Sequence, residues 1–279
     1  MTRCVRITTL DENTARGRGL LAEHGLSFWI ELGDRKILFD TGQGYVLAPN
    51  ARKLGIRLDQ ADAIVLSHGH YDHTGGLGDA LPAGRKATVH VHPAAFEPKY
   101  SRNPDGSARA VGMHTTIQQK LRENAELVWV QEPATLCDGL RLTGPVPRTN
   151  DFEDTGGAFF KDRDCTEPDD LLDDQAAFVE TPVGTVVILG CAHSGVINTL
   201  RHIRTLTDNH PIHTVVGGMH LLKASPERMD KTLAELRRLD IQNLLPCHCT
   251  GFDATARLWN EFKGRCSTCP VGTVVEVSG

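Results

Sequence analysis

Short runs of apolar residues separated by polar turns dominate the first half of the chain, and they predict β-strands. The strands expected there are Cys4–Thr9, Ser27–Leu32, Lys36–Asp40, Ala63–Ser67, Thr88–His92 and Leu127–Val130. In the second half, strand-like runs alternate with segments whose apolar residues recur every three or four positions, as on one face of a helix. Strands are expected over Ala176–Glu180, Thr185–Leu189, Thr214–Val216 and Val271–Val277, and helices over Val196–Leu206, Arg228–Leu239 and Thr255–Phe262. The mixture predicts an α/β fold with two sheets and outer helices.

Two stretches show neither the strand pattern nor the helix pattern of apolar residues: residues 93–112 and the acidic segment 163–174. Loops of this length in a compact protein are often lids or disordered segments. Neither stretch has the composition of a linker between independent units, so residues 1–279 are expected to form a single domain.

Composition excludes several classes of function. The formal net charge is −5 and the sequence pI is about 6.2, which argues against nucleic-acid binding, because that needs a basic face. No apolar run approaches the length of a membrane span, and the N-terminus lacks the apolar core of a signal peptide. A cytoplasmic protein is therefore expected, in which the eight cysteines are thiols or metal ligands rather than disulfides. The oligomeric state stays open.

One segment gathers metal-ligand side chains at the end of a predicted strand. IVLSHGHYDHTGGL, residues 64–77, holds His68, His70, Asp72 and His73 within six positions. His68 and His70 are two residues apart, so in extended backbone they point the same way. Asp72 and His73 follow on a turn and can face a second point. One metal ion would seldom use all four ligands, whereas two ions roughly 3.5–4 Å apart would.

These residues carry a resemblance to a known family. HGHYDH fits the HxHxDH signature of the metallo-β-lactamase superfamily, and LFDTG at 38–42 resembles its first motif. The aspartate of that motif, here Asp40, would orient a ligand histidine through a hydrogen bond. Further segments resemble one subgroup, labelled 7,8-dihydropterin-6-methyl-4-(β-D-ribofuranosyl)aminobenzene 5′-phosphate synthase-like; they are ENTA at 12–15, EHGLSFWIE at 23–31, GCAHSGVINTL at 190–200, VVGGMHLL at 215–222 and PCHCTG at 246–251. The resemblance spans about residues 5 to 277. It implies an αββα sandwich of two mixed sheets with outer helices, with the metal site at the sheet edges.

The resemblance also implies further ligands. His248 in PCHCTG matches the superfamily's last motif, a histidine on the second metal. The third-motif histidine is missing, because Asp174 stands in its place, and Cys191 stands where a bridging Asp or Cys is expected. Either His193 replaces the missing histidine, or Asp174 and Cys191 bind metal themselves; we favour His193, which follows a strand and a glycine. The expected metal ligands are His68, His70, Asp72, His73, His193 and His248.

Other candidate residues have several interpretations. His220 in GGMHLL ends a strand-like run and is a candidate proton donor, metal ligand or structural histidine, and His24 is expected to support the site or the structure. Cys247, Cys249, Cys266 and Cys269 are a candidate for an additional zinc site, but His248 between the first two is already assigned to the main site.

Two metals that share a bridging water lower its pKa enough to supply hydroxide at neutral pH. The leading expectation is therefore a dinuclear metal-dependent hydrolase that uses a metal-bridged hydroxide, with zinc as the expected ion and manganese or iron as alternatives. Asp72 is expected to hold the nucleophile's proton, and His220 is the next candidate, as general acid to the leaving group.

The expected substrate is a small molecule with a phosphoester or phosphodiester bond. Cations in PKYSR at 98–102, Arg109 and Arg148 are placed to cover the site, and arginine's planar fork suits phosphate. The subgroup name implies a phosphorylated pterin-type ligand. Arg148 and Glu153, in PVPRTNDFE, are expected in the substrate pocket.

Two other classes compete with the hydrolase. A di-iron redox or oxygen-handling protein would use the same ligands, and iron content with oxygen uptake would identify it. A non-catalytic metal or ligand sensor would bind metal without turnover, although a complete set of buried polar ligands argues against lost catalysis.

Overall fold

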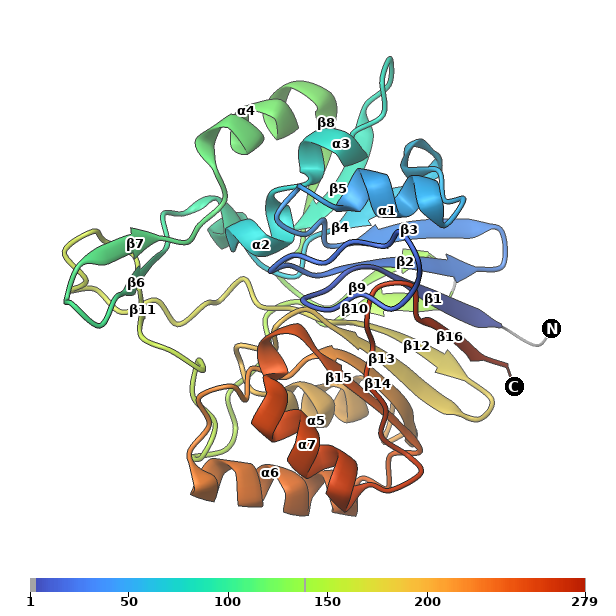
Figure 1. The fold of residues 1–279 in the computed structure, drawn as a ribbon, viewed down its shortest axis with the longest axis vertical. Helices are drawn as coiled ribbons and strands as arrows, with labels where there is room; N and C mark the ends of the chain where they lie inside the picture. The colour runs from blue at the N-terminus through green and yellow to red at the C-terminus, as the bar shows by residue number, and fades with distance from the viewer. Residues whose placement is uncertain (1–3, 138, 279) are drawn as a thin grey trace.

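Two β-sheets face each other in the computed structural model, which describes residues 4–137 and 139–278. Helices cover the outer face of each sheet (Figure 1). The first sheet has the order β16-β1-β2-β3-β4-β5-β8 and the second has the order β15-β14-β13-β12-β10-β9. Both sheets are mixed, because β3, β4, β5 and β8 run parallel, as do β13, β14 and β15, while the remaining neighbours run antiparallel. The predicted αββα sandwich with two mixed sheets is confirmed.

The elements have the following bounds. The strands of the first sheet are β1 (Val5–Asp11), β2 (Ser27–Leu32), β3 (Arg35–Phe39), β4 (Ala63–Val65), β5 (Ala87–Val91), β8 (Ala125–Trp129) and β16 (Val274–Val277). Those of the second sheet are β9 (Ala134–Cys137), β10 (Leu140–Leu142), β12 (Ala177–Thr181), β13 (Gly184–Leu189), β14 (Ile212–Gly218) and β15 (Asn243–Cys247). The helices are α1 (Leu47–Lys53), α2 (Tyr71–Thr74), α3 (Leu77–Ala80), α4 (Thr115–Asn124), α5 (Val196–Leu206), α6 (Pro226–Arg238) and α7 (Phe252–Glu261), with short 3-10 turns at Leu58–Gln60, Pro93–Phe96 and His248–Thr250.

Strand alternation explains the layers. In β13, Val186 and Ile188 point into the core between the sheets, whereas Val187 and Leu189 point towards α5 and α6. Successive side chains of a strand face opposite sides, so a strand buried on both faces needs an uninterrupted apolar run. The same division in the first sheet places Trp29 of β2 in the core under α1, α3 and α4. The sequence pattern therefore predicts most of the sandwich strands, but β9, β10 and β15 were missed.

A third, small sheet was not predicted. It has the order β11-β6-β7, with β6 at Tyr100–Arg102, β7 at Ala108–Ala110 and β11 at Phe159–Phe160. It projects from one side of the sandwich, and its strands come from segments far apart in the sequence (Figure 1). Residues 93–112 were expected to be irregular, but they contain the antiparallel pair β6–β7, to which β11 adds a third strand.

No helix within the described parts of the chain combines the length and the apolar character needed to cross a bilayer. The cytoplasmic location and the single domain stay predictions.

Candidate metal centre

The site forms where the carboxyl ends of parallel strands from both sheets meet. Asp40 follows β3 and His68 follows β4 in the first sheet. His193, His220 and His248 follow β13, β14 and β15 in the second. Because parallel strands end at a common sheet edge, side chains separated by more than 100 residues come together here.

The backbone at these strand ends is left-handed without glycine. Asp40, Ala192, His220 and His248 have φ values of 57°, 54°, 46° and 52°. Such a conformation costs about 1–3 kcal/mol for a residue with a side chain, and it persists only where the surrounding structure imposes it. Here it turns the backbone sharply at the end of each strand and brings the side chains of Asp40, His193, His220 and His248 into the site.

One group of ligands consists of His68, His70 and His193, whose nearest ring nitrogens lie within 4.8 Å of one another. His193 Nδ1 faces the carbonyl oxygen of Thr155 at 2.8 Å and must donate to it, so its Nε2 carries a lone pair. His193 Nε2 and His70 Nε2 are both buried, and neither has a hydrogen-bond partner among the described residues. His68 Nε2 and His70 Nδ1 stand 2.9 Å apart.

Asp40 fixes the ring of His68 through Ser67. The Ser67 hydroxyl donates to Asp40 Oδ2 at 2.6 Å, so it can only accept from His68 Nδ1, which lies at 2.9 Å. His68 therefore also presents the lone pair of its Nε2. Asp40 Oδ2 further accepts from His73 Nδ1 at 2.7 Å, which is the hydrogen bond expected from the LFDTG motif.

The second group consists of Asp72, His73 and His248. Asp72 Oδ2 lies 3.4 Å from His248 Nε2 and 4.0 Å from His73 Nε2. His248 Nδ1 is held by Asn13 Oδ1 at 2.8 Å, and its backbone N–H donates to Glu12. Burial opposes the ionisation of Asp72, but hydrogen bonds from His24 and His248 hold the pKa of this carboxyl well below its usual value.

The arrangement around His73 calls for a positive charge. Its Nε2 faces His248 Nε2 at 3.2 Å and Cys191 Sγ at 3.2 Å, and lone pairs at such distances repel unless a cation lies between them. Burial opposes a proton on His73, yet the Asp40 carboxylate outweighs it and raises the pKa of His73 to about 9. A metal ion would supply the same charge, and the nitrogen, sulfur and carboxylate donors suit a divalent transition metal. The donor set thus fits the metal that the fold implies.

Burial keeps the other histidines neutral, which is the state that binds metal. It lowers the pKa of His68 and His193 far below the ordinary value, and it lowers the pKa of His70 to about 3. Neighbouring histidines act in the same direction. Cys191 lies between the two groups and belongs to three of the candidate clusters, with His68 and His73, with His193 and His220, and with His248 and Cys249.

His24, which was expected to support the site or the structure, lies beside the second group of donors. Its Nε2 lies 3.1 Å from Asp72 Oδ2, and it forms a cluster with Asp72 and His248. It comes from the connection between β1 and β2, where no ligand spacing marks it. Among the residues that hold donor rings, Asn13 lies in the ENTA segment that resembles the subgroup, whereas the roles of Ser67 and Thr155 were not predicted.

His220 stands beside His193, with ring centroids 4.2 Å apart. Its Nδ1 is buried without a partner and is covered by Gly156, where a Cβ atom would lie 1.9 Å away. Burial is the main reason that the pKa of His220 falls to about 3. The ring is therefore neutral near pH 7, which fits a ligand or a hydrogen-bonding group better than an imidazolium acid.

The alternatives for the missing third-motif histidine are now distinguishable by position. Asp174 accepts from the backbone N–H of Ser194 at 2.8 Å and so supports the turn that carries His193. His193 itself enters the site, whereas Asp174 belongs to none of the candidate ligand clusters among the described residues. The geometry favours His193.

The four C-terminal cysteines do not converge. Cys249 faces Cys191 at the main site, donating to its carbonyl oxygen at 3.6 Å. Cys269 lies beside Thr9 and Cys247, in the core between the sheets. Cys266 packs in the separate core under α7. An additional four-cysteine zinc site is thus not formed in the described chain.

A cavity of about 530 Å³ opens over the ligands. Its floor includes His70, Asp72, Cys191, His193, His220 and His248. The small sheet forms its roof, with Ser101, Arg102, Arg109 and Phe159 among the lining residues. Phe159 packs against His70 and His193, with ring centroids 5.0 and 5.1 Å away.

The structure gives Arg148 and Glu153 other positions than the expected substrate pocket. Arg148 donates to the carbonyl oxygen of Asp170 at 2.8 Å. The Glu153 carboxylate accepts from the backbone N–H groups of Ile197 and Asn198 and so caps the N-terminus of α5. Neither lines the cavity, so the assignment of both to substrate binding is corrected.

The acidic segment 163–174 is anchored rather than a free lid. Asp173 Oδ2 accepts from the backbone N–H of Gly69, between the two ligand histidines, at 2.6 Å. Its Oδ1 pairs with Lys99 Nζ at 2.8 Å, and Lys99 also pairs with Asp169 at 3.0 Å. Lys99, expected among the cations over the site, is instead 2% exposed in this triad.

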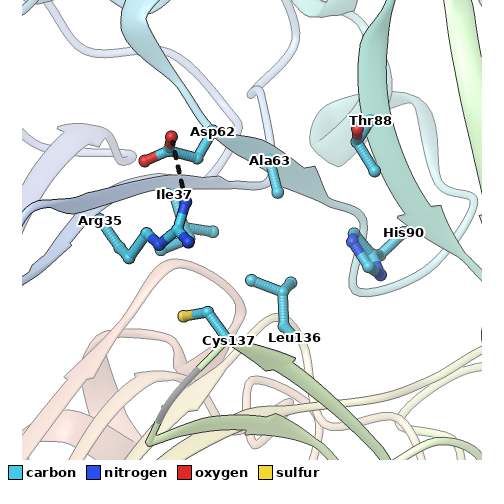
Figure 2. A pocket seen from close by; sticks show the side chains of 8 residues that line it. All are labelled: Arg35, Ile37, Asp62, Ala63, Thr88, His90, Leu136 and Cys137. Atoms are coloured by element: carbon cyan, nitrogen blue, oxygen red, sulfur yellow. Dashed lines mark ion pairs between the residues drawn. The ribbon is translucent and has the colours of Figure 1, made fainter.

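A second cavity, of about 350 Å³, lies at the other end of the strands. Figure 2 shows Arg35 and Asp62 at its edge, 3.7 Å apart, with His90 and Leu136 nearby. Arg35 begins β3 and Asp62 precedes β4, whereas the ligands follow these strands. This cavity is therefore separate from the metal centre.

The fold and the ligand arrangement define a metallo-β-lactamase-type centre, and comparison with known proteins agrees. The model of the metallo-beta-lactamase superfamily matches residues 21–248, and the chain belongs to this superfamily. Its members' fold implies that divalent metal is bound here.

Individual relatives are similar over nearly their whole length. An uncharacterized protein of Methanocaldococcus jannaschii is 32% identical over 90% of this chain and 93% of its own. The 7,8-dihydropterin-6-methyl-4-(beta-D-ribofuranosyl)-aminobenzene-5'-phosphate synthase of the same organism is 28% identical over 98% and 96%. The solved structure of Tm1679, described as a metal-dependent hydrolase of the beta-lactamase superfamily, has a TM-score of 0.84 with 33% identity, over 99% of this chain and 100% of that one.

Proposed function

We propose that this protein is a metal-dependent hydrolase that holds two divalent metal ions and cleaves a phosphoester or phosphodiester bond in a small molecule. The observation that supports it most is the orientation of the histidines. His68, His73, His193 and His248 each direct Nδ1 to a fixed partner and Nε2 to the site. Such preorganisation is typical of metal ligands.

Two separate groups of donors support two ions. His68, His70 and His193 would hold one, with nitrogens close enough to share an ion. Asp72, His73 and His248, whose donor atoms lie 3.2–4.0 Å apart, would hold the other, with Cys191 between the two groups. Zinc is the ion we expect first, while manganese and iron also accept this donor set. Two such ions, when bound, would acidify a water molecule and polarise the substrate.

The protein's own groups then have defined tasks. Asp72 is ionised and reaches into the cavity, so it can orient the attacking water and accept its proton. Phe159 covers His70 and His193 and limits access of bulk water. The neutral His220 lines the same cavity and can hydrogen-bond the leaving group.

Hydrolysis also agrees with the description of Tm1679, and the name of the synthase relative includes a phosphate group. A phosphorylated substrate suits the cationic residues of the cavity, Arg102, Arg109 and Lys223. The proposed hydrolysis differs from the synthase reaction that the relative's name describes. A site that activates water is suited to cleave a bond rather than to form one.

The test begins with metal content. The protein is purified without chelators, and metals are measured by mass spectrometry in the wild type, His68→Ala, His193→Ala and a control, His114→Ala. His114 is exposed at the start of α4 and belongs to none of the candidate metal clusters among the described residues. We expect about two ions per chain in the wild type and control, and fewer in both site variants.

Turnover of bis(4-nitrophenyl) phosphate is then measured in the same samples. We expect it in the wild type and control only. Less than about half an equivalent of metal after reconstitution would contradict the proposed centre. Metal-loaded protein that cleaves none of a broad panel of phosphoesters would contradict the hydrolase, and iron with oxygen uptake would favour the redox alternative.

A further inference from the structure

The roof sheet places one row of side chains over the metal centre. Phe159 of β11 pairs with Ser101 of β6, and Ser101 pairs with Arg109 of β7. Residues directly opposite each other in neighbouring strands point to the same face of a sheet. Phe159 contacts the ligand rings, and all three residues line the cavity, so this is the face turned towards the metal centre.

The position of Arg109 relative to the ligands is set by its own strand. The carbonyl oxygen of Val111 accepts from the backbone N–H of Tyr71 at 3.0 Å, next to His70. His70 itself forms a β-bridge with Gly112. Arg109 is two residues before Val111 and on the same face, roughly 7 Å further along the strand. Its guanidinium therefore belongs to the outer part of the cavity, beyond the metal ligands.

Arg109 differs from Arg102, the other arginine of the cavity, in having its donors free. Within residues 4–137 and 139–278, the structure gives its side chain neither a hydrogen bond nor an ion pair. Arg102, in contrast, donates to the carbonyl oxygen of Cys165 at 2.6 Å and stacks over Phe160. An arginine with five free donors in a cavity is suited to bind a carboxylate or phosphate in a bidentate manner.

The charge balance of the cavity supports an anionic ligand. Its lining includes Arg102, Arg109 and Lys223 but a single carboxylate, Asp72, which belongs to the metal ligands. Tyr71 and Ser101 line the same cavity and add hydroxyl groups to it.

We propose that Arg109, together with Ser101 and Tyr71, forms a subsite for a second anionic group of the substrate, a carboxylate or phosphate remote from the bond that is cleaved. This subsite depends on the proposed function in one respect, namely that the phosphoester to be cleaved lies at the metal ligands. It narrows the substrate class to small molecules with two anionic groups separated by a spacer of several atoms.

The test uses non-hydrolysable probes, so that binding is measured apart from turnover. Zinc-reconstituted protein is titrated calorimetrically with alkylphosphonates, with ω-phosphonocarboxylates and with α,ω-bisphosphonates that have two to five methylene groups. The variants are Arg109→Gln, Arg109→Lys and Arg52→Gln as control, since Arg52 is exposed on α1 and does not line the cavity.

We expect wild type and Arg52→Gln to bind the best dianion about 10- to 100-fold more tightly than the matched alkylphosphonate, as a charge-assisted pair provides. Arg109→Gln should lose this preference without weakening alkylphosphonate binding, and Arg109→Lys should keep part of it. Comparison of the two dianion series shows whether the subsite takes carboxylate or phosphate.

Two results would overturn the subsite. One is a wild type that shows no preference for either dianion series at any spacer length. The other is a preference that Arg109→Gln retains. An Arg109-dependent preference in protein that cleaves no phosphoester would support the subsite and contradict the proposed function, so the two failures are distinguishable.

Discussion

Lys99 is buried in a triad with two carboxylates, and its removal is predicted to be severe. The side chain of Lys99 is 1% exposed, and those of Asp169 and Asp173 are 5% and 0% exposed. Lys99→Met keeps most of the volume and the packing of the stem but leaves both carboxylates without their cation. Breaking a buried ion pair from one side costs about 3–5 kcal/mol, because the remaining charge stays desolvated.

The contacts of the two aspartates place the cost towards the upper part of that range. Each keeps only backbone donors, Gly69 for Asp173 and Leu171 for Asp169. Without Lys99 the two buried carboxylates repel each other, which adds to the loss of unfolding free energy. In the wild type, Asp173 and Asp169 hold the pKa of Lys99 above its usual value despite burial. The contribution of Lys99 to the free energy of unfolding is therefore kept as pH rises until it reaches that raised pKa.

The assay is urea unfolding at pH 5 and pH 8, with metal content measured in parallel. Lys161→Met is the matched control, because Lys161 pairs with Glu167 at 3.7 Å near the same segment but its side chain is 37% exposed. We expect the control to lose less than about 1 kcal/mol of unfolding free energy. Since Asp173 holds Gly69, Lys99→Met should also reduce metal content. An unfolding free energy within about 1 kcal/mol of the wild type at both pH values would refute the reasoning.

Three further predictions concern single residues. Burial and the neighbouring Glu23 raise the pKa of Asp11 to about 10, so the stability linked to its proton is complete at acidic pH and is lost as pH rises towards that value; Asp11→Asn should therefore melt increasingly above the wild type between pH 6 and pH 9, and parallel melting curves would contradict this. Asp40→Asn removes the carboxylate that orients two ligand rings, and chelator competition should show about 10- to 100-fold weaker metal binding, whereas unchanged affinity would exclude that role. Gly156→Ala would push a Cβ atom against His220, whereas Gly55, with a similar φ of 73°, lies in open space. The melting temperature should therefore fall further for Gly156→Ala than for Gly55→Ala. Equal decreases would mean that the contact is unimportant.

Most sandwich strands could be predicted because a strand that is buried on both faces appears in the sequence as an uninterrupted apolar run. Ser27–Leu32 was predicted with its observed bounds, and so was the helix Val196–Leu206. Helix α4 was missed because only Ile117 and Leu121 are buried in its ten residues, so its periodicity is faint. Helix α1 was missed because it is short and contains Pro49. Strand β15 has the length of β5 but was missed because Asn243 and Pro246 interrupt its apolar run, and proline is uncommon inside a strand.

The ligand set was predictable where spacing carries the chemistry. His68, His70, Asp72 and His73 lie in one segment, and the structure brings them to one place with His193 and His248. The groups that orient them depend on contacts across long sequence distances, so even the ENTA segment did not reveal that Asn13 holds His248, and no local pattern marked Thr155. Glu153 was misassigned for the same reason, because a capping carboxylate looks like any other until the helix it caps is seen.

The roof sheet has a consequence for the order in which the protein folds. Its middle strand, β6, comes from the first half of the chain, and β11 follows the strands that begin the second sheet. Closing so long a loop is unfavourable until both halves have collapsed, so non-local pairing of this kind forms late. We expect refolding protein to gain its two cores first and the covered cavity last. Ligands that fit the cavity should then act on the final step of refolding and leave the earlier collapse unchanged.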